Sequence, residues 1–226
     1  MSQRVLYHLP LSPFSRKVRL LLAEKNLPFS LKAEQVWDRR PQFLALNPAG
    51  QVPVLVEPDG AALTHSQVIT EYLEEVFADP ELPLLGTAAI DKAETRRLVL
   101  WFDEKFYDEV GDLLLGERVT KRLMRQGQPD AAAIRAGLAN IHYHLDYIRF
   151  LMERRRWLAG DRFGLADMAA AAHLSCLDYL DDIPWQQHPA AKEWYARVKS
   201  RPSFRPLLDD QVAGVPPARH YADLDF

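Results

Sequence analysis

Ser12-Pro13-Phe14-Ser15 lies between an apolar run, residues 5–9, and a basic stretch of helix-forming residues. The two flanks predict a strand over 4–9 and a helix over 14–24. Ser12 suits the N-cap of this helix, with Pro13 at its first position. Ser12 can equally donate a hydrogen bond to a bound thiolate, because free N–H groups and a positive dipole end lie behind it. The sequence permits both interpretations.

Composition limits the classes of function that this chain can have. It has 226 residues, a formal net charge of −3 and one cysteine. The charge argues against nucleic-acid binding, and no apolar run reaches the roughly twenty residues of a membrane span. A single cysteine, Cys176, allows neither a disulfide nor a cysteine zinc site, and we expect it in the core. We therefore expect a cytoplasmic protein without a metal and without membrane insertion.

The first part of the chain alternates strands and helices. Beyond the segments already described, the pattern predicts a strand over 29–33, a short helix over 41–46, strands over 52–56 and 61–64, and a helix over 66–77. Pro58-Asp59-Gly60 has the composition of a turn, so the last two strands are expected to form a hairpin. This alternation predicts a compact α/β domain.

The second part contains helical patterns only. They cover residues 88–125, 130–157, 165–180, 189–200 and 203–210. In this part Gly164 and Asp167 have the spacing of a capping box, with Phe163 placed to pack on Met168. We expect an α/β domain over 1–78, a proline-rich linker over 79–87, an all-helical domain over 88–214 and an extended C-terminal tail over 215–226.

This organisation resembles the cytosolic glutathione S-transferase superfamily, in which a thioredoxin-like α/β domain precedes an all-α domain. Three motifs carry the resemblance: residues 12–19, Asn47-Pro48-Ala49-Gly50-Gln51-Val52-Pro53, and residues 160–167. It implies a cis bond before Pro53, a backbone contact of Val52 with glutathione, and Ser12 near the glutathione thiol. Ser12 and Ser15 stand where a thioredoxin-like redox protein carries cysteines, which argues against disulfide exchange because serine is a far poorer nucleophile.

One residue departs from the family's pattern. The family usually has an acidic residue before Ser66, to pair with the amino group of glutathione, and this chain has His65. Loss of a charge-assisted partner typically costs about 1.5–3 kcal/mol. We therefore expect little or no glutathione binding and no cofactor, although Ser66 can still hold a carboxylate at a helix start. A plain surface role for His65 is favoured over a catalytic one.

Two segments are candidates for a partner surface. Trp37-Asp38-Arg39-Arg40 places a tryptophan among charges, and tryptophan and arginine often dominate binding at interfaces. The chain end carries acidic and aromatic residues, among them Asp223, Asp225 and Phe226. Trp37 can alternatively pack on its own domain or line a substrate groove. The tail can alternatively be solvated or folded back.

Taken together, these features resemble the FtsZ-binding branch of glutathione transferase-like proteins in bacterial cell division. This resemblance implies a non-catalytic homodimer that binds FtsZ filaments, alters their curvature and acts at the division site. Trp101, Phe102, Phe106 and Tyr107 on one long helix are the expected dimer contacts. The alternative hypothesis is a glutathione transferase that uses Ser12 to activate the thiol of bound glutathione.

Overall fold

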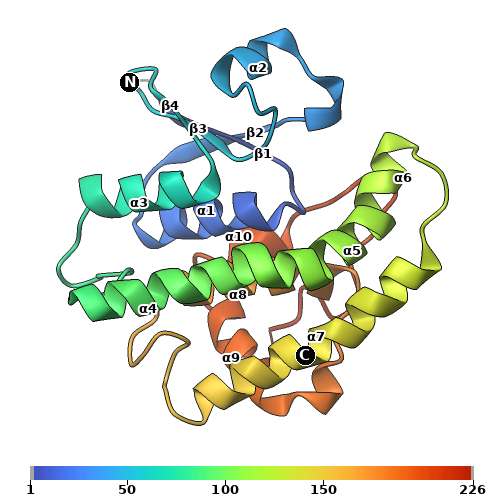
Figure 1. Cartoon of the computed structure of the whole chain (residues 1–226). Helices are drawn as coiled ribbons and strands as arrows, with labels where there is room; N and C mark the ends of the chain where they lie inside the picture. The colour runs from blue at the N-terminus through green and yellow to red at the C-terminus, as the bar shows by residue number, and fades with distance from the viewer. Residues whose placement is uncertain (1–2, 225–226) are drawn as a thin grey trace. The chain divides into compact units, whose positions relative to one another are not determined.

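The computed structural model describes residues 3–224. The chain divides into two compact units, Met1–Pro83 and Leu84–Phe226. The first combines a sheet with helices, and the second is built from helices joined by turns (Figure 1). A thioredoxin-like domain followed by an all-helical domain is the fold class that the sequence predicts.

The first unit is organised around a four-stranded sheet. Its strands lie in the order β2 (Phe29–Ala33), β1 (Arg4–His8), β3 (Val54–Val56) and β4 (Ala62–Thr64). β1 and β2 are parallel, whereas the other two pairings are antiparallel. The expected hairpin is confirmed, with β3 paired to β4 and a turn closed by the bond from the Gly60 N–H to the Glu57 carbonyl, at 2.9 Å.

Three helices cover this sheet. α1 (Pro13–Glu24) and α3 (Ser66–Val76) pack against each other on one face, and α2 (Pro41–Leu46) lies on the other (Figure 1). The fully buried side chains include Leu6, Leu55, Leu21, Ile69 and Leu73. Apolar residues of the strands and of both helices thus form one core, as their spacing predicts.

The second unit packs its helices around α8. The helices are α4 (Ala89–Leu100), α5 (Asp112–Leu115), α6 (Lys121–Met124), α7 (Ala131–Met152), α8 (Leu165–Tyr179), α9 (Pro189–Lys199) and α10 (Arg205–Leu208). Every residue of α8 is buried, including Cys176 as expected. Its many alanines keep the surface of α8 small enough for neighbouring helices to approach on all sides.

The helix predicted over 88–125 differs from expectation in its winding. Residues Trp101–Gly111 and Gly116–Thr120 form wider π-helical turns between the α-helical pieces α4, α5 and α6. Buried side chains recur here every fourth residue, at Phe102, Phe106 and Val110. Residues four apart share one face of a helix, so this row forms the side of the segment that faces the core.

The start of α8 depends on one buried carboxylate. Asp167 accepts hydrogen bonds from the Gly164 N–H at 3.1 Å, the Leu158 N–H at 3.0 Å and the Trp194 ring N–H at 2.8 Å. The bond to Gly164 is the predicted capping interaction, and the other two join a loop and α9 to the same group. Burial raises the pKa of Asp167 to about 6, against the lowering effect of these three donors.

Asp167→Asn should lower the free energy of unfolding by about 2–4 kcal/mol. An amide has only one acceptor oxygen, so at least one of the three buried donors loses its partner, and an unsatisfied buried donor costs about 1–3 kcal/mol. Urea unfolding followed by circular dichroism measures the change. Asp161→Asn, an exposed neighbour, is the control and should stay within about 0.5 kcal/mol of the parent. Equal stability of the two variants would contradict the role of Asp167.

Candidate functional site

The strand register brings the candidate residues of the first unit to one end of the sheet. Tyr7 of β1 pairs with Val54 of β3, which in turn pairs with Thr64 of β4. Ser12 follows β1, Pro53 precedes β3 and His65 follows β4, so all three leave the sheet at this end. β2 runs parallel to β1 and ends at Ala33, opposite His8, which places the loop containing Trp37 at the same end.

Ser12 occupies the N-cap of α1, as predicted. Its Oγ accepts a hydrogen bond from the Ser15 N–H at 3.2 Å, and Pro13 is the first residue of the helix. The side chain is half-buried, so the hydroxyl proton can still be donated outward while the oxygen accepts the capping bond. The capping role of Ser12 is therefore observed, and it does not exclude hydrogen bonding to a ligand.

The loop before β3 contains the cis peptide bond that the resemblance implies. The peptide bond between Val52 and Pro53 is cis, as expected, and the Pro53 side chain is buried. Buried Asn47 holds the loop, because its amide donates to the Gln51 carbonyl at 2.7 Å and its Oδ1 accepts from the Ala49 N–H at 3.1 Å. Val52 is left half-buried at the strand end.

His65 and Ser66 form the start of α3 and differ sharply in environment. His65 is exposed and has a φ of 72°, a backbone conformation that residues other than glycine adopt infrequently. Ser66 is 2% exposed, and its Oγ has no hydrogen-bond partner in the part of the chain described. A strained backbone and an unsatisfied hydroxyl at a helix N-terminus suit an anionic ligand group, but no carboxylate stands at position 65 to pair with an ammonium.

The loop after β2 is held by a residue that the sequence analysis did not single out. Glu34 is buried, its N–H donates to the His8 carbonyl at 3.0 Å, and its carboxylate forms a two-point ion pair with Arg40. Trp37 lies half-buried in the short 3₁₀ turn Val36–Asp38 between these two anchors, whereas Asp38 and Arg39 are exposed. Arg40 thus has a partner within the loop, which limits the part it can take in binding another molecule.

The second unit contains the predicted tail. Asp223 is exposed, and no helix is formed after Leu208 within residues 209–224. Asp225 and Phe226, also predicted as partner contacts, lie outside the described residues.

In residues 3–224 no cluster of three or more histidine, cysteine or acidic side chains could hold a metal ion. No helix among those described is long and apolar enough to cross a membrane.

Comparison with known proteins identifies the family. Residues 6–81 match the N-terminal domain of glutathione S-transferase, and residues 113–202 match its C-terminal domain. These two matches cover most of the chain, and relatives match it over almost its whole length. The chain therefore belongs to the glutathione S-transferase family.

Three of these similar proteins define the branch of the family. FtsZ-localized protein A of Caulobacter vibrioides is 50% identical, and the match covers 99% of each chain. The solved structure of FzlA from C. crescentus has a TM-score of 0.95 at 50% identity, covering 99% of this chain and 100% of that one. A crystal structure described as a glutathione S-transferase from Rhodospirillum rubrum F11 has a TM-score of 0.97 at 56% identity, with the same coverage. The resemblance to a division-linked branch of the family is therefore confirmed.

His65→Glu should strengthen glutathione binding about ten- to hundredfold over a weak parent, because it restores a carboxylate for the ammonium group. Isothermal titration calorimetry with millimolar glutathione measures both proteins. His65→Gln, of similar size and without charge, is the matched control and should bind no better than the parent. Micromolar binding by the parent would refute the expected weakness, and no gain with glutamate would show that the missing charge is not what limits binding.

Proposed function

We propose that this protein binds filaments of the tubulin-like division polymer FtsZ and regulates their curvature at the division site, with little or no glutathione binding. The observation that carries this proposal is the 50% identity with FtsZ-localized protein A along the whole chain. The replacement of the family's acidic residue by His65 supports a role other than glutathione chemistry. The partner contacts we propose are Trp37, Asp38, Arg39 and Arg40, together with Asp223, Asp225 and Phe226.

The geometry of the loop containing Trp37 supports its role as an anchor. The loop is tied at both ends by Glu34, through the His8 carbonyl and the Arg40 guanidinium. A large aromatic side chain that is already held in a fixed position loses little conformational entropy on binding. More of its contact energy then contributes to affinity, and tryptophan residues often dominate the binding energy of interfaces. The exposed charges of Asp38 and Arg39 then add orientation to the contact.

Trp37→Ala should weaken FtsZ binding by about 2 kcal/mol or more, roughly thirtyfold, if the indole is desolvated in the complex. Co-sedimentation with polymerised FtsZ measures the affinity, and thermal melting checks that the fold survives. Gln35→Ala, an exposed neighbour in the same loop, is the control and should bind like the parent. Undiminished binding by a folded Trp37→Ala variant would remove the loop from the interface.

Asp225→Lys should weaken the same interaction through charge, with a smaller effect at high salt, because a rim charge acts mainly on association. Asp161→Lys reverses an exposed charge elsewhere in the second unit and controls for the change in net charge. Equal binding of both reversals would move the contact to other residues. The basic stretch Arg118, Lys121, Arg122 and Arg125 would be tested next.

We also propose a homodimer, with a contact face different from the one first expected. Phe102 and Phe106 are fully buried within the chain, so the prediction that they contact a second subunit is wrong. Trp101 instead packs against Tyr147 of α7, with ring centroids 4.4 Å apart and the ring planes tilted by 41°. The exposed ring of Tyr143 lies beside Trp101, and the exposed ring of Phe150 stacks near Tyr147. Aromatic side chains are enriched in interface cores and lysine is depleted there, so we place the rings of this cluster in the contact and Lys105, which lies over the rings of Trp101 and Tyr143, at its rim.

Light scattering at micromolar concentration should give twice the chain mass. Phe150→Glu places a charge in the aromatic face and should shift the protein toward the monomer, since an unpaired charge at an interface core is costly. Ile90→Glu, at another exposed apolar residue, is the comparison and should leave the dimer intact. A parent protein of monomeric mass would overturn the proposed dimer, and an unaffected Phe150→Glu dimer would overturn the proposed face.

The second candidate function is a glutathione transferase in which Ser12 stabilises the thiolate of bound glutathione. The buried, unpartnered Oγ of Ser66 at the start of α3 favours it, because this hydroxyl can hold a carboxylate. Turnover of a standard electrophile with glutathione that is lost in Ser12→Ala would return the protein to the enzyme class.

A further inference from the structure

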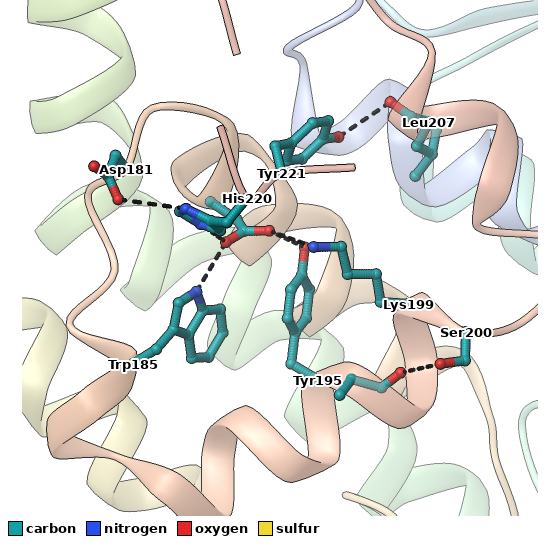
Figure 2. A network of polar contacts seen from close by, with 10 residues as sticks. Asp181, Trp185, Tyr195, Lys199, Ser200, Leu207, His220 and Tyr221 are labelled. Atoms are coloured by element: carbon teal, nitrogen blue, oxygen red, sulfur yellow. Dashed lines mark hydrogen bonds and ion pairs between the residues drawn. The ribbon is translucent and has the colours of Figure 1, made fainter. Parts of the chain in front are cut away.

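The C-terminal end of α8 carries a buried carboxylate on which four side chains converge. Asp178 is fully buried. Its Oδ1 accepts from the ring N–H of Trp185 at 2.8 Å and from Nε2 of His220 at 3.0 Å. Its Oδ2 accepts from the hydroxyl of Tyr195 at 3.2 Å and from Nζ of Lys199 at 3.3 Å. Figure 2 shows Trp185, Tyr195, Lys199 and His220 pointing toward this one group, here called the Asp178 cluster.

The four side chains that bind Asp178 come from three segments outside α8. Trp185 lies in the turn after α8, Tyr195 and Lys199 lie on α9, and His220 lies near the chain end. Lys199 and Asp178 form an ion pair in which neither side chain is exposed. Such a pair is costly to bury and strongly destabilising to break on one side only, so it keeps α9 against the end of α8.

The chain end is joined to the same place by backbone bonds. The Ala218 N–H donates to the Tyr179 carbonyl at 2.8 Å, and the Tyr179 hydroxyl donates to the Val215 carbonyl at 2.7 Å. Tyr221 is 1% exposed, and its hydroxyl donates to the Leu207 carbonyl at 3.1 Å. The segment 212–224 is therefore folded back onto the helical unit, one of the two forms considered for the tail.

His220 is the member of the cluster that belongs to this segment. Its side chain is 31% exposed, and its Nδ1 lies 3.7 Å from the exposed carboxylate of Asp181. The pKa of His220 is raised, first by its hydrogen bond to Asp178 and also by the charges of Asp178 and Asp181, against burial and the charge of Lys199. The contact thus attracts the imidazolium more strongly than the neutral ring.

We propose that Asp178 is a positioning residue for partner binding, which holds the segment 212–224 through His220 and thereby sets where the acidic chain end leaves the helical unit. This inference rests on the proposed function, because the partner is the FtsZ polymer. Asp223, the described acidic residue among the proposed contacts of the chain end, lies within the held segment, and its N–H donates to the His220 carbonyl at 2.9 Å. A flexible end would have to be ordered when it binds, whereas a held end has lost that entropy already.

The test uses His220, because its replacement leaves the buried ion pair of Asp178 and Lys199 complete. His220→Ala removes the donor to Asp178, and His220→Gln can restore a donor at a similar position. His142→Ala is the matched control: His142 is also a half-buried histidine, and its ring contacts His188 at 2.9 Å instead of the chain end. Each protein is measured by thermal melting, by hydrogen exchange resolved at single amides, and by co-sedimentation with FtsZ polymer.

In His220→Ala we expect the amides of Ala218 and Tyr221 to exchange about tenfold faster or more, with amides of α7 unchanged. FtsZ binding should weaken about fivefold or more. His220→Gln should restore both properties in large part, and His142→Ala should alter neither, even if it melts at a lower temperature. This pattern separates positioning from a general loss of stability.

Two results would overturn the inference alone, and a third would overturn the proposed function together with it. Unchanged exchange at Ala218 and Tyr221 in His220→Ala would show that Asp178 does not hold the segment. Faster exchange with undiminished FtsZ binding would show that holding it is irrelevant to the partner, and the proposed function would stand. If the parent protein fails to sediment with FtsZ, the proposed function falls and positioning for that partner falls with it, while exchange still decides whether His220 holds the segment.

Discussion

Complete burial of α8 is the constraint on which the second unit depends. A helix without a solvent-facing side must find an internal partner for every polar group it carries, and its two ends are the most demanding. Asp167 meets this demand at the helix start by accepting the Gly164 N–H, whereas Asp178, near the other end, is itself a buried group that needs donors. Each carboxylate accepts bonds from segments distant in sequence. These bonds therefore also fix the positions of α9 and of the segment 212–224 relative to α8.

In the first unit, the sheet rather than a buried helix positions the candidate site residues. Its sheet is a common scaffold of the glutathione S-transferase family, and the register carries Ser12, Pro53, His65 and the loop containing Trp37 to one end. At this end His65 stands directly before Ser66, and Glu34 stiffens the neighbouring loop by pairing with Arg40. Residues at one end of a sheet can thus differ in the ligand or partner that they suit while the fold stays the same.

Several features followed from local sequence with little ambiguity. Ser12 before Pro13 specified the cap of α1, the Pro58-Asp59-Gly60 turn specified the hairpin, and the Gly164 to Asp167 spacing specified the start of α8. These are short-range interactions in which the participating groups are within four residues of each other. The helix over 88–125 was correct in extent but not in winding, since Trp101–Gly111 and Gly116–Thr120 form π-helical turns that the apolar spacing did not indicate.

The sequence by itself determined the two-part organisation, most strand and helix positions and the presence of His65 directly before Ser66, because these depend on periodicity, capping and residue identity. Only the tertiary structure decided that Phe102 and Phe106 are core residues, that Arg40 is paired with Glu34, and that the segment 212–224 is folded back. The physical reason is distance along the chain. His220 meets Asp178 across 42 residues, and Lys199 meets it across 21. No local pattern encodes such a meeting, since a buried carboxylate and its donors are recognisable as a set only after the helices have packed.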